Sequence, residues 1–261
     1  MKTITTLFAL TLSASINTAA IAQETGVHGT VVVGAATAPE YEGSDKQRIV
    51  PLVVGRINDG NRYVAFEGPT LRANVLDSRW LELGLVMNVT AKRGRNIKSL
   101  AVSRLGAIKD AVEAGAFVAV SHGVSGNDRI RFAIQGVQDI SGVHKGWLGS
   151  ATASYAVPIN PKLTLAADVA ATYASADYAR TYFTISAAGS VSSGLAAFNA
   201  KSGIKDVGGS MTVRYALSKR SSLLGLGAYK RLLGSVADSP IVRGAGSPDQ
   251  FVGAIGVGFS F

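Results

Sequence analysis

Apolar residues recur at every second position along most of this chain. The clearest example is residues 80–89, whose apolar positions are Leu81, Leu83, Leu85, Met87 and Val89. Glycine and polar residues fall among the positions between them, so an extended strand here has one apolar face and one mixed face. The same period recurs in residues 162–173, 206–217 and 251–261. A series of strands of about ten residues with this pattern is typical of transmembrane β-barrels.

Short turns alternate with long connections between the predicted strands. Short turns are predicted at 58–61, 76–78, 125–128, 160–162 and 218–221. Longer loops are predicted at about 37–47, 92–112, 139–145, 175–205 and 233–249. A barrel in an outer membrane has short turns at its periplasmic end and long loops at its outer end. The pattern therefore predicts an all-β, antiparallel up-and-down barrel.

The number of strands depends on residues 62–75. A single-chain bacterial barrel has an even number of strands. One continuous strand over residues 62–75 would give eleven, whereas a break at Gly68-Pro69 gives two short strands and a total of twelve. Because proline is confined to strand ends, edges and bulges, we expect the break and about twelve strands, with ten or fourteen still open.

The first residues have the layout of a secretory signal peptide. Lys2 precedes an apolar stretch from Ile4 to about Ile16, and small residues lead to Ala20-Ile21-Ala22. We therefore expect cleavage between Ala22 and Gln23, which divides the chain into a signal peptide, 1–22, and a barrel domain, 23–261. The sequence has no cysteine, so neither disulfides nor thiolate metal ligands are available.

A soluble β-sandwich would also show alternating strands. Its solvated face would be rich in polar residues, whereas here the mixed face is rich in Gly, Ala, Ser and Thr, which suit a narrow lumen. The last strand also resembles the aromatic assembly signal of outer-membrane barrels, which we assign to Phe251, Phe259 and Phe261. Both observations favour the barrel in the outer membrane.

Several segments resemble the MipA/OmpV family, the MltA-interacting proteins of Gram-negative outer membranes. They include Ser193-Gly194-Leu195, Arg231–Gly234 and three loops, in which the matching residues are Pro39, Tyr41, Gly43, Ser44, Asp45, Asp177, Tyr178, Tyr182, Asp238, Ser239 and Pro240. The resemblance implies an outer-membrane barrel. Some members are similar to scaffolds that hold a murein hydrolase near a murein synthase, and others are discussed as adhesins or porin-like proteins.

The residues offer little for catalysis. The histidines are His28, His122 and His144, and His28 and His122 are expected at the periplasmic end. Ser121 and His122 are neighbours on a strand and point to opposite faces, so they do not form a nucleophile and base. The sequence has no Gly-x-Ser-x-Gly elbow, zinc-ligand cluster or phosphate-binding loop. We therefore expect neither an enzyme nor a cofactor or metal.

Charged residues on the mixed face are the second group of candidates. Those expected to face the lumen are Glu82, Arg129, Arg131, Asp168, Arg214 and Arg231. They either line a pore that prefers anions or pair with one another in a filled barrel, and the many small residues beside them favour pairing.

Two loops are candidates for binding. Residues 92–109 carry a basic cluster that suits lipopolysaccharide phosphates, or that is simply solvated: Lys92, Arg93, Arg95, Lys98, Arg104 and Lys109. Residues 175–205 carry Tyr178, Tyr182, Phe183 and Phe198, which either recognise a ligand or fold back as a plug. No nucleic-acid recognition motif is present.

The prediction that follows is a non-catalytic outer-membrane barrel that acts as a scaffold, with murein-remodelling proteins as partners on the periplasmic side and membrane lipid and lipopolysaccharide around it. A narrow porin for small polar solutes and a surface adhesin acting through the outer loops remain the alternatives.

Overall fold

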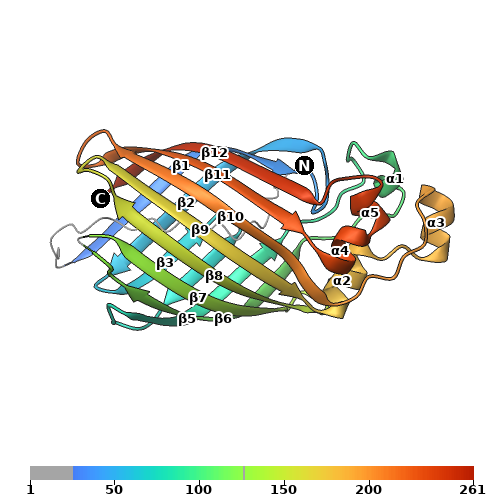
Figure 1. Ribbon diagram of the computed structural model, residues 1–261, viewed down its shortest axis with the longest axis horizontal. Coiled ribbons are helices and arrows are strands. Elements are labelled where there is room, and N and C mark those ends of the chain that lie inside the picture. The colour runs from blue at the N-terminus through green and yellow to red at the C-terminus, as the bar shows by residue number, and fades with distance from the viewer. Residues whose placement is uncertain (1–25, 126) are drawn as a thin grey trace.

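The alternating segments form the strands of a closed barrel with a helical cap at one end (Figure 1). The computed structural model describes residues 26–125 and 127–261. The predicted signal peptide and its cleavage residues, Ala20, Ala22 and Gln23, lie outside the described residues.

Twelve antiparallel strands make up the barrel in the described chain, as predicted. Each strand pairs with its neighbours in sequence, and the first pairs with the last from Thr30–Ser260 to Thr37–Gly253, which closes the wall. The strands are β1 (Val27–Pro39), β2 (Gln47–Asp59), β3 (Arg62–Glu67), β4 (Thr70–Asn74), β5 (Leu81–Thr90), β6 (Ala111–His122), β7 (Arg129–Asp139), β8 (Trp147–Pro158), β9 (Leu163–Ala174), β10 (Gly203–Ala216), β11 (Ser221–Leu232) and β12 (Asp249–Ser260).

The break at Gly68-Pro69 is confirmed. β3 and β4 are short strands joined by these two residues, and Gly68 adopts the left-handed conformation that the tight turn requires (φ 61°). The barrel wall is therefore shorter at β3 and β4 than at the other strands. On the neighbouring strand β2, Pro51 lies beyond the tip of this hairpin, where a residue without an N–H leaves no donor unpaired.

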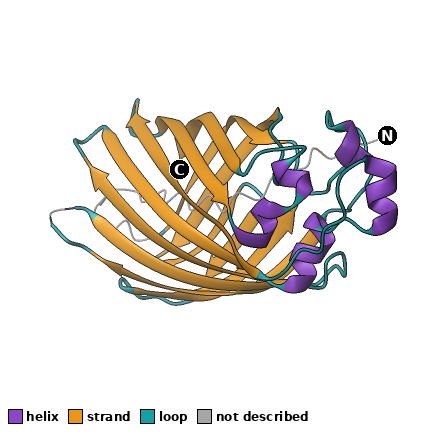
Figure 2. Cartoon of the chain, turned by 45° about the vertical axis from the view of Figure 1, so that its right-hand side comes forward, coloured by secondary structure: helices purple, strands orange, loops and turns teal. Residues whose placement is uncertain are grey.

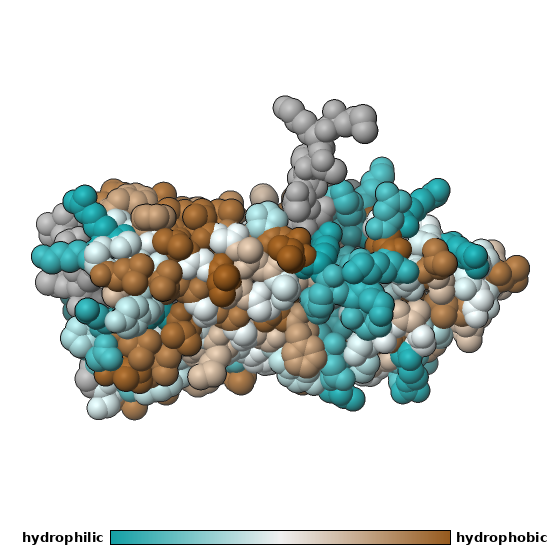
Figure 3. Space-filling model, turned by 90° about the horizontal axis from the view of Figure 1, so that it is seen from above, coloured by the Kyte–Doolittle hydropathy of each residue, from teal (hydrophilic) through white to brown (hydrophobic). Residues whose placement is uncertain are grey.

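The outer surface of the barrel is largely apolar (Figure 3). Exposed aromatic residues lie near both of its ends. Toward the cap, Trp147 stacks on Tyr173 at 5.1 Å between ring centroids, and Tyr229 contacts Phe251 at 5.0 Å. Toward the short turns, the outward-facing aromatic residues include Trp80, Tyr155, Tyr215, Phe259 and Phe261. Two aromatic girdles around an apolar band are the arrangement of a membrane-spanning barrel.

The lumen is apolar on one side. Inward-facing side chains of β1, β2, β11 and β12 pack into one buried cluster, which we call the apolar wall: Val32, Ala36, Ala38, Val50, Leu52, Val54, Leu224, Leu226, Ala228, Val252 and Ala254. Close backbone contact helps to form it, because a Cβ at Gly34 would lie 2.0 Å from the carbonyl oxygen of Ile255. Side chains therefore fill this half of the barrel.

Helices form at the end that carries the long connections (Figure 2). They were not predicted, and their bounds are α1 (Leu100–Ser103), α2 (Ala176–Phe183), α3 (Ala187–Ser193), α4 (Gly234–Asp238) and α5 (Pro240–Arg243). Ser175, Ser186 and Ser239 begin α2, α3 and α5 by accepting a hydrogen bond from a first-turn N–H. None of the helices in the described chain has both the length and the hydropathy to cross a membrane.

Candidate functional site

Four loops build the cap over the outer mouth of the barrel, and three of them carry the family-like segments. We use the name cap for residues 40–46, 91–110, 175–202 and 233–248. Ser239 Oγ donates to the carbonyl oxygen of Phe183 at 2.7 Å, and Tyr41 Oη donates to that of Ala245 at 3.2 Å. Tyr178 Oη donates to Glu42 Oε2 at 2.8 Å. Segments far apart in the sequence therefore meet at one site.

Two glycines allow these loops to touch. Gly43 is in the left-handed conformation (φ 93°), and a Cβ there would lie 2.7 Å from a methyl group of Val242. A Cβ on Gly246 would lie 1.8 Å from the carbonyl oxygen of Gly43, which accepts a hydrogen bond from Ser247 N. A side chain at either position would push the loops apart.

Tyrosine and aliphatic side chains form the interior of the cap. One buried cluster is Ala174, Tyr178, Ala179, Tyr182, Phe183, Ala200, Leu232, Val236 and Val242, and a second is Tyr41, Val102, Ile185 and Ile241. The loop 175–205 thus packs against the end of the barrel through its aromatic side chains. The exposed family-like acids Asp45, Asp177 and Asp238 instead pair locally with Lys46, Arg180 and Arg243.

A buried ion network joins the cap to the barrel. Glu42 from the cap accepts from Lys205 Nζ at 2.5 Å and from Lys230 Nζ at 2.9 Å. Lys205 also pairs with its neighbour Asp206. Two consecutive residues point inward because β10 has a bulge between Ile204 and Asp206, which breaks the alternation. The network holds two acids and two bases, so its charges balance.

The charge of Glu42 depends on its lysine partners. Burial opposes ionisation of this carboxyl, but Lys205 and Lys230 outweigh burial and hold its pKa well below the ordinary value. Burial, reinforced by the charge of Glu42, raises the pKa of Tyr178 well above its usual range. The tyrosine is therefore a permanent hydrogen-bond donor to a permanent carboxylate.

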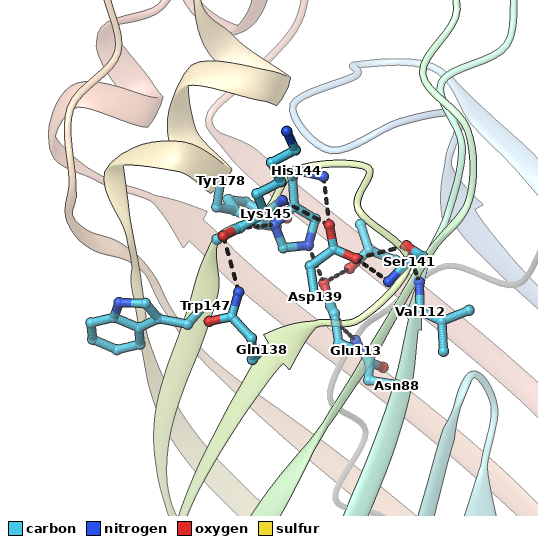
Figure 4. A network of polar contacts seen from close by, with 12 residues as sticks. Asn88, Val112, Glu113, Gln138, Asp139, Ser141, His144, Lys145, Trp147 and Tyr178 are labelled. Carbon is cyan, nitrogen blue, oxygen red and sulfur yellow. Dashed lines mark hydrogen bonds and ion pairs between the residues drawn. The ribbon is translucent and has the colours of Figure 1, made fainter.

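A second polar network surrounds His144, whose side chain is fully buried (Figure 4). The His144 Nδ1 atom accepts from Gly146 N at 3.1 Å, so the neutral ring carries its proton on Nε2, which donates to Glu113 Oε1 at 3.0 Å. Asn88 and Thr90 donate to the same carboxylate. Asp139 accepts from the N–H groups of the following loop, including that of His144 at 2.7 Å. This network fixes the β7–β8 loop against β6.

Two of the predicted lumen charges form a pair. Arg131 donates through Nε and Nη2 to the two oxygens of Glu82, at 3.1 and 2.9 Å, and Tyr63 Oη donates to the same carboxylate at 2.7 Å. Arg56 lies 3.5 Å from the ring centroid of Tyr63. The predicted pairing is therefore present at this position, where side chains from β5 and β7 meet on the lumen side of β6.

A further pair was not anticipated. Arg72 forms an ion pair with Glu67 at 2.7 Å across the β3–β4 hairpin, and its Nη2 reaches Gln135 Oε1 of β7 at 2.6 Å. Since both Glu67 and Arg72 face inward on strands too short to show a period in the sequence, the alternation could not identify them.

The other predicted lumen charges have different surroundings. Asp168 accepts from Ser210 Oγ at 3.0 Å through one oxygen, and Arg129 donates to the carbonyl oxygen of Arg79 at 3.1 Å. Arg214 faces the lumen, and its Nε has no hydrogen-bond partner among the described residues. We call the inward-facing polar residues of β8, β9 and β10 the polar wall: Ser154, Asp168, Ser210, Thr212 and Arg214.

Arg231 does not face the lumen, which corrects the sequence prediction. Its side chain is 53% exposed and pairs with Asp249 at 2.7 Å on the outer face, where Tyr229 Oη donates to the same oxygen. Strict alternation from the buried Leu232 also places it outside. A charge is accommodated there because Arg231 lies at the cap end of β11, near the level of the aromatic girdle rather than at mid-membrane.

A cavity of about 110 Å³ lies in the lumen beneath the cap. Its upper side is formed by cap residues, among them Arg93, Tyr178 and Tyr182, and the barrel strands contribute small residues such as Ala170 and Gly209. The residues that line it also include Asp168 and the ion network of Glu42, Lys205, Asp206 and Lys230. The family-like tyrosines therefore border an internal space as well as packing the cap.

The predicted basic cluster divides in two. Lys92, Arg95, Lys98, Arg104 and Lys109 are exposed on the cap, whereas Arg93 is 7% exposed and donates to the carbonyl oxygen of Tyr182 at 2.9 Å. Arg93 is thus part of the interior. Ser121 is buried in the barrel and His122 is exposed, and the described residues contain no group of three His, Cys, Asp or Glu side chains that could hold a metal ion.

Comparisons with known proteins give one family and a set of barrels. The family model described as MltA-interacting protein MipA matches residues 31–261. No curated protein gives a significant match. The outer membrane channel of Pseudomonas putida F1 is 11% identical, with a TM-score of 0.47 over 92% of this chain and 97% of that chain. The channel DcaP of Acinetobacter baumannii is 12% identical, with a TM-score of 0.43 over 90% and 96%.

Proposed function

Because the chain belongs to the family of the MltA-interacting protein MipA, we propose that it is a non-catalytic docking protein that binds a murein-remodelling enzyme at its periplasmic end. It is a β-barrel of the Gram-negative outer membrane. The family description itself refers to an interaction with MltA, and the arrangement of the barrel supports a role that uses its surface.

The observation that carries this proposal is the cap packed over the outer mouth. Cap side chains such as Tyr178 and Phe183 are buried above the lumen, and Glu42 ties the cap to β10 and β11 through Lys205 and Lys230. Below them, the apolar wall fills half of the barrel. A cap above and a packed wall below favour a function at the two ends of the barrel over one in its lumen.

The periplasmic end carries an excess of positive charge. Its short turns expose Arg62, Arg79, Lys162, Lys219 and Arg220. Among the described residues, the acids beside them are Asp59, Asp77 and Asp128. The turns themselves engage two of these, since Asp77 accepts from Asn61 N and Asp128 accepts from Ser125 N. Since complementary charge directs association, the partner surface should be acidic.

Binding of the MltA enzyme from the same organism tests the proposal. The barrel would be inserted into nanodiscs, and the affinity for purified MltA would be measured with the triple variant Lys162→Glu, Lys219→Glu, Arg220→Glu. Three reversed charges at the proposed interface should weaken binding by at least about tenfold and make it less sensitive to salt.

The matched control reverses three cap lysines, Lys92→Glu, Lys98→Glu and Lys109→Glu, and so makes the same change in net charge at the other end. It should bind MltA as the unmodified barrel does. Equal losses in both variants would indicate a general charge effect, and undetectable binding by the unmodified barrel would refute this partner.

A narrow channel is the second candidate, and the polar wall is the observation that favours it. Its inward-facing side chains are polar and include Arg214, which is only half-buried, so of the two walls this one is suited to contact water or an anionic solute. Conductance in a planar bilayer separates this candidate from docking.

A further inference from the structure

We propose that lipopolysaccharide binds to one side of the barrel, with its phosphate groups on the loop 91–110 and an acyl chain in a notch of the wall below that loop. This goes beyond docking, because it concerns the outer end of the barrel and a lipid of the outer leaflet. It rests on two features of the structure: a strand edge that no other strand covers, and a pair of opposed lysines without an anionic partner.

The notch lies above the β3–β4 hairpin, which is too short to reach the end of β2. β2 pairs with β1 along its whole length, Gln47–Asp59, but its pairing with β3 begins only at Val54. On the other flank, β5 pairs with β4 as far as Asn88. Beyond the turn at Gly68-Pro69, the described wall therefore lacks two strands between β2 and β5. Three strand spacings, or about 14 Å, separate β2 from β5 at the base of this notch.

Apolar side chains border the notch on the outer surface of the barrel. Ile49 and Pro51 face outward on β2, and Met87 faces outward on β5. The carbonyl oxygen of Val53 accepts from Gly68 N, so the backbone groups of Pro51, two residues further along, also face the notch. Proline supplies no N–H there, which disfavours an added strand from a second protein. An acyl chain forms no hydrogen bonds and suits such an edge.

Above the notch, the loop 91–110 carries two lysines that lie opposite each other. Arg93 and Ile108 exchange two backbone hydrogen bonds, of 3.1 and 2.9 Å, in the same register as β5 and β6 below them. This register places Lys92 opposite Lys109. Because Arg93 is buried, the neighbouring lysines point outward, and both are exposed. Like charges directly opposite each other destabilise a strand pair, so an anion between the lysines stabilises the arrangement.

Cations outnumber acids on the surface of this loop. Three more exposed cations accompany the two lysines, namely Arg95, Lys98 and Arg104. None of the five forms an ion pair within the described chain. The nearby acids accept from backbone N–H groups, Asp110 from Lys92 N at 2.8 Å and Glu40 from Lys98 N at 2.9 Å. The remaining positive charge suits phosphate groups, which accept charge-assisted hydrogen bonds.

The cations and the notch lie one above the other. The bond from Lys98 N to Glu40 ties the loop 91–110 to the β1–β2 connection, so the loop passes across the top of the notch toward β1. Asp110, at the base of the loop, lies within electrostatic reach of Arg48 on β2. Hydrophilic residues gather at the junction of barrel and cap, beside the apolar surface of the barrel (Figure 3). A phosphorylated lipid matches this order, with its headgroup above and its chains below.

Native mass spectrometry of the refolded barrel with diphosphoryl lipid A tests the site. The double variant Lys92→Gln, Lys109→Gln should bind this lipid at least about tenfold more weakly than the unmodified barrel. Lipid A without its phosphates should bind the unmodified barrel just as weakly. The matched control, Lys162→Gln with Lys219→Gln, removes two exposed charges at the periplasmic turns and should leave the affinity unchanged.

Three results would overturn the proposal. They are no binding of diphosphoryl lipid A at about 10 μM, equal losses in the two double variants, and binding of inorganic phosphate as tight as that of lipid A. The last result would indicate a site for anions in general, without a seat for the lipid chain.

A nitroxide label locates the acyl chain. The sequence has no cysteine, so Ile49→Cys provides a single attachment site beside the notch, and Val169→Cys provides an outward-facing control on β9. Diphosphoryl lipid A should broaden the electron paramagnetic resonance spectrum of the label at position 49 and leave that at position 169 unchanged. No change at position 49, or equal changes at both, would contradict the notch. So would a label at position 49 that is already immobile in a lipid-free dimer, because a second copy would then cover the edge.

Discussion

The two halves of the lumen differ in how completely their side chains satisfy one another. Along the apolar wall, residues such as Leu52, Leu224 and Leu226 pack in one buried cluster. Along the polar wall, Thr212 Oγ1 and Arg214 Nε are buried without a partner among the described residues. The boundary runs between β10 and β11, where Thr212 lies directly opposite Leu226. One half is thus a core that stabilises the barrel, and the other is a surface kept inside it.

The largest expected effect comes from the ion network at the top of the polar wall. Glu42→Ala removes the acid shared by Lys205 and Lys230 and leaves two buried cations with Asp206 alone. Removing one partner of a buried pair costs about 3–5 kcal/mol. The midpoint of urea unfolding should fall accordingly, and the cap should become sensitive to protease. A midpoint unchanged from that of the unmodified barrel would show that the network does not hold the cap.

A smaller loss is expected when the apolar wall is made to resemble the polar one. Leu226→Thr removes buried methyl groups and adds a hydroxyl to a cluster that offers no partner, which should cost about 2–4 kcal/mol in unfolding free energy. Equilibrium unfolding in lipid vesicles measures this. If the variant is as stable as the unmodified chain, the apolar wall is not a packed core.

Acid should destabilise the cap through the same carboxylate. The folded pKa of Glu42 lies below its ordinary value of about 4.5, so its stabilising effect is present above that pH and is lost as the pH falls through the folded pKa. Stability should therefore be constant near neutral pH and decline below about pH 4.5. Unfolding midpoints at a series of pH values test this, and the decline should be smaller in Glu42→Gln.

The smallest effect is expected in the polar wall. If water reaches Thr212, Thr212→Val should change the unfolding free energy by less than about 0.5 kcal/mol. If the wall is dry, the same change should stabilise the barrel by about 1–3 kcal/mol, because it removes an unsatisfied buried hydroxyl. A stabilising result would erase the difference between the two walls.

The sequence predicted the barrel well because alternation is a local property. The residues of one strand are enough to show which of them share a face, and the break at Gly68-Pro69 follows from the chemistry of proline. Alternation does not place Lys205, because a bulge turns two successive residues inward and leaves no mark on the pattern. Arg231 was assigned to the mixed, inward face, although its position at the end of β11 lets it reach a partner outside.

The candidate site was harder to predict because it is assembled from loops. The sequence pointed to Tyr41, Tyr178 and Tyr182 only through the family resemblance. Their contacts join residues far apart in the chain: 89 positions for Tyr182 with Arg93, 136 for Tyr178 with Glu42 and 204 for Tyr41 with Ala245. The sequence does contain a local signal for two of the helices, because Ser175 and Ser186 are N-cap residues. Charge pairs such as Glu42 with Lys230 require the closed barrel to bring them together.

Single-channel recording tests the central claim that the capped barrel is closed. Residues 23–261 would be refolded, and insertion into the bilayer would be verified by flotation with lipid and by heat-modifiable migration on electrophoresis. The account predicts that the inserted barrel shows no discrete ionic steps at neutral pH. Steady steps from the inserted barrel, altered by Arg214→Gln, would contradict the closed barrel and establish the polar wall as a conducting path.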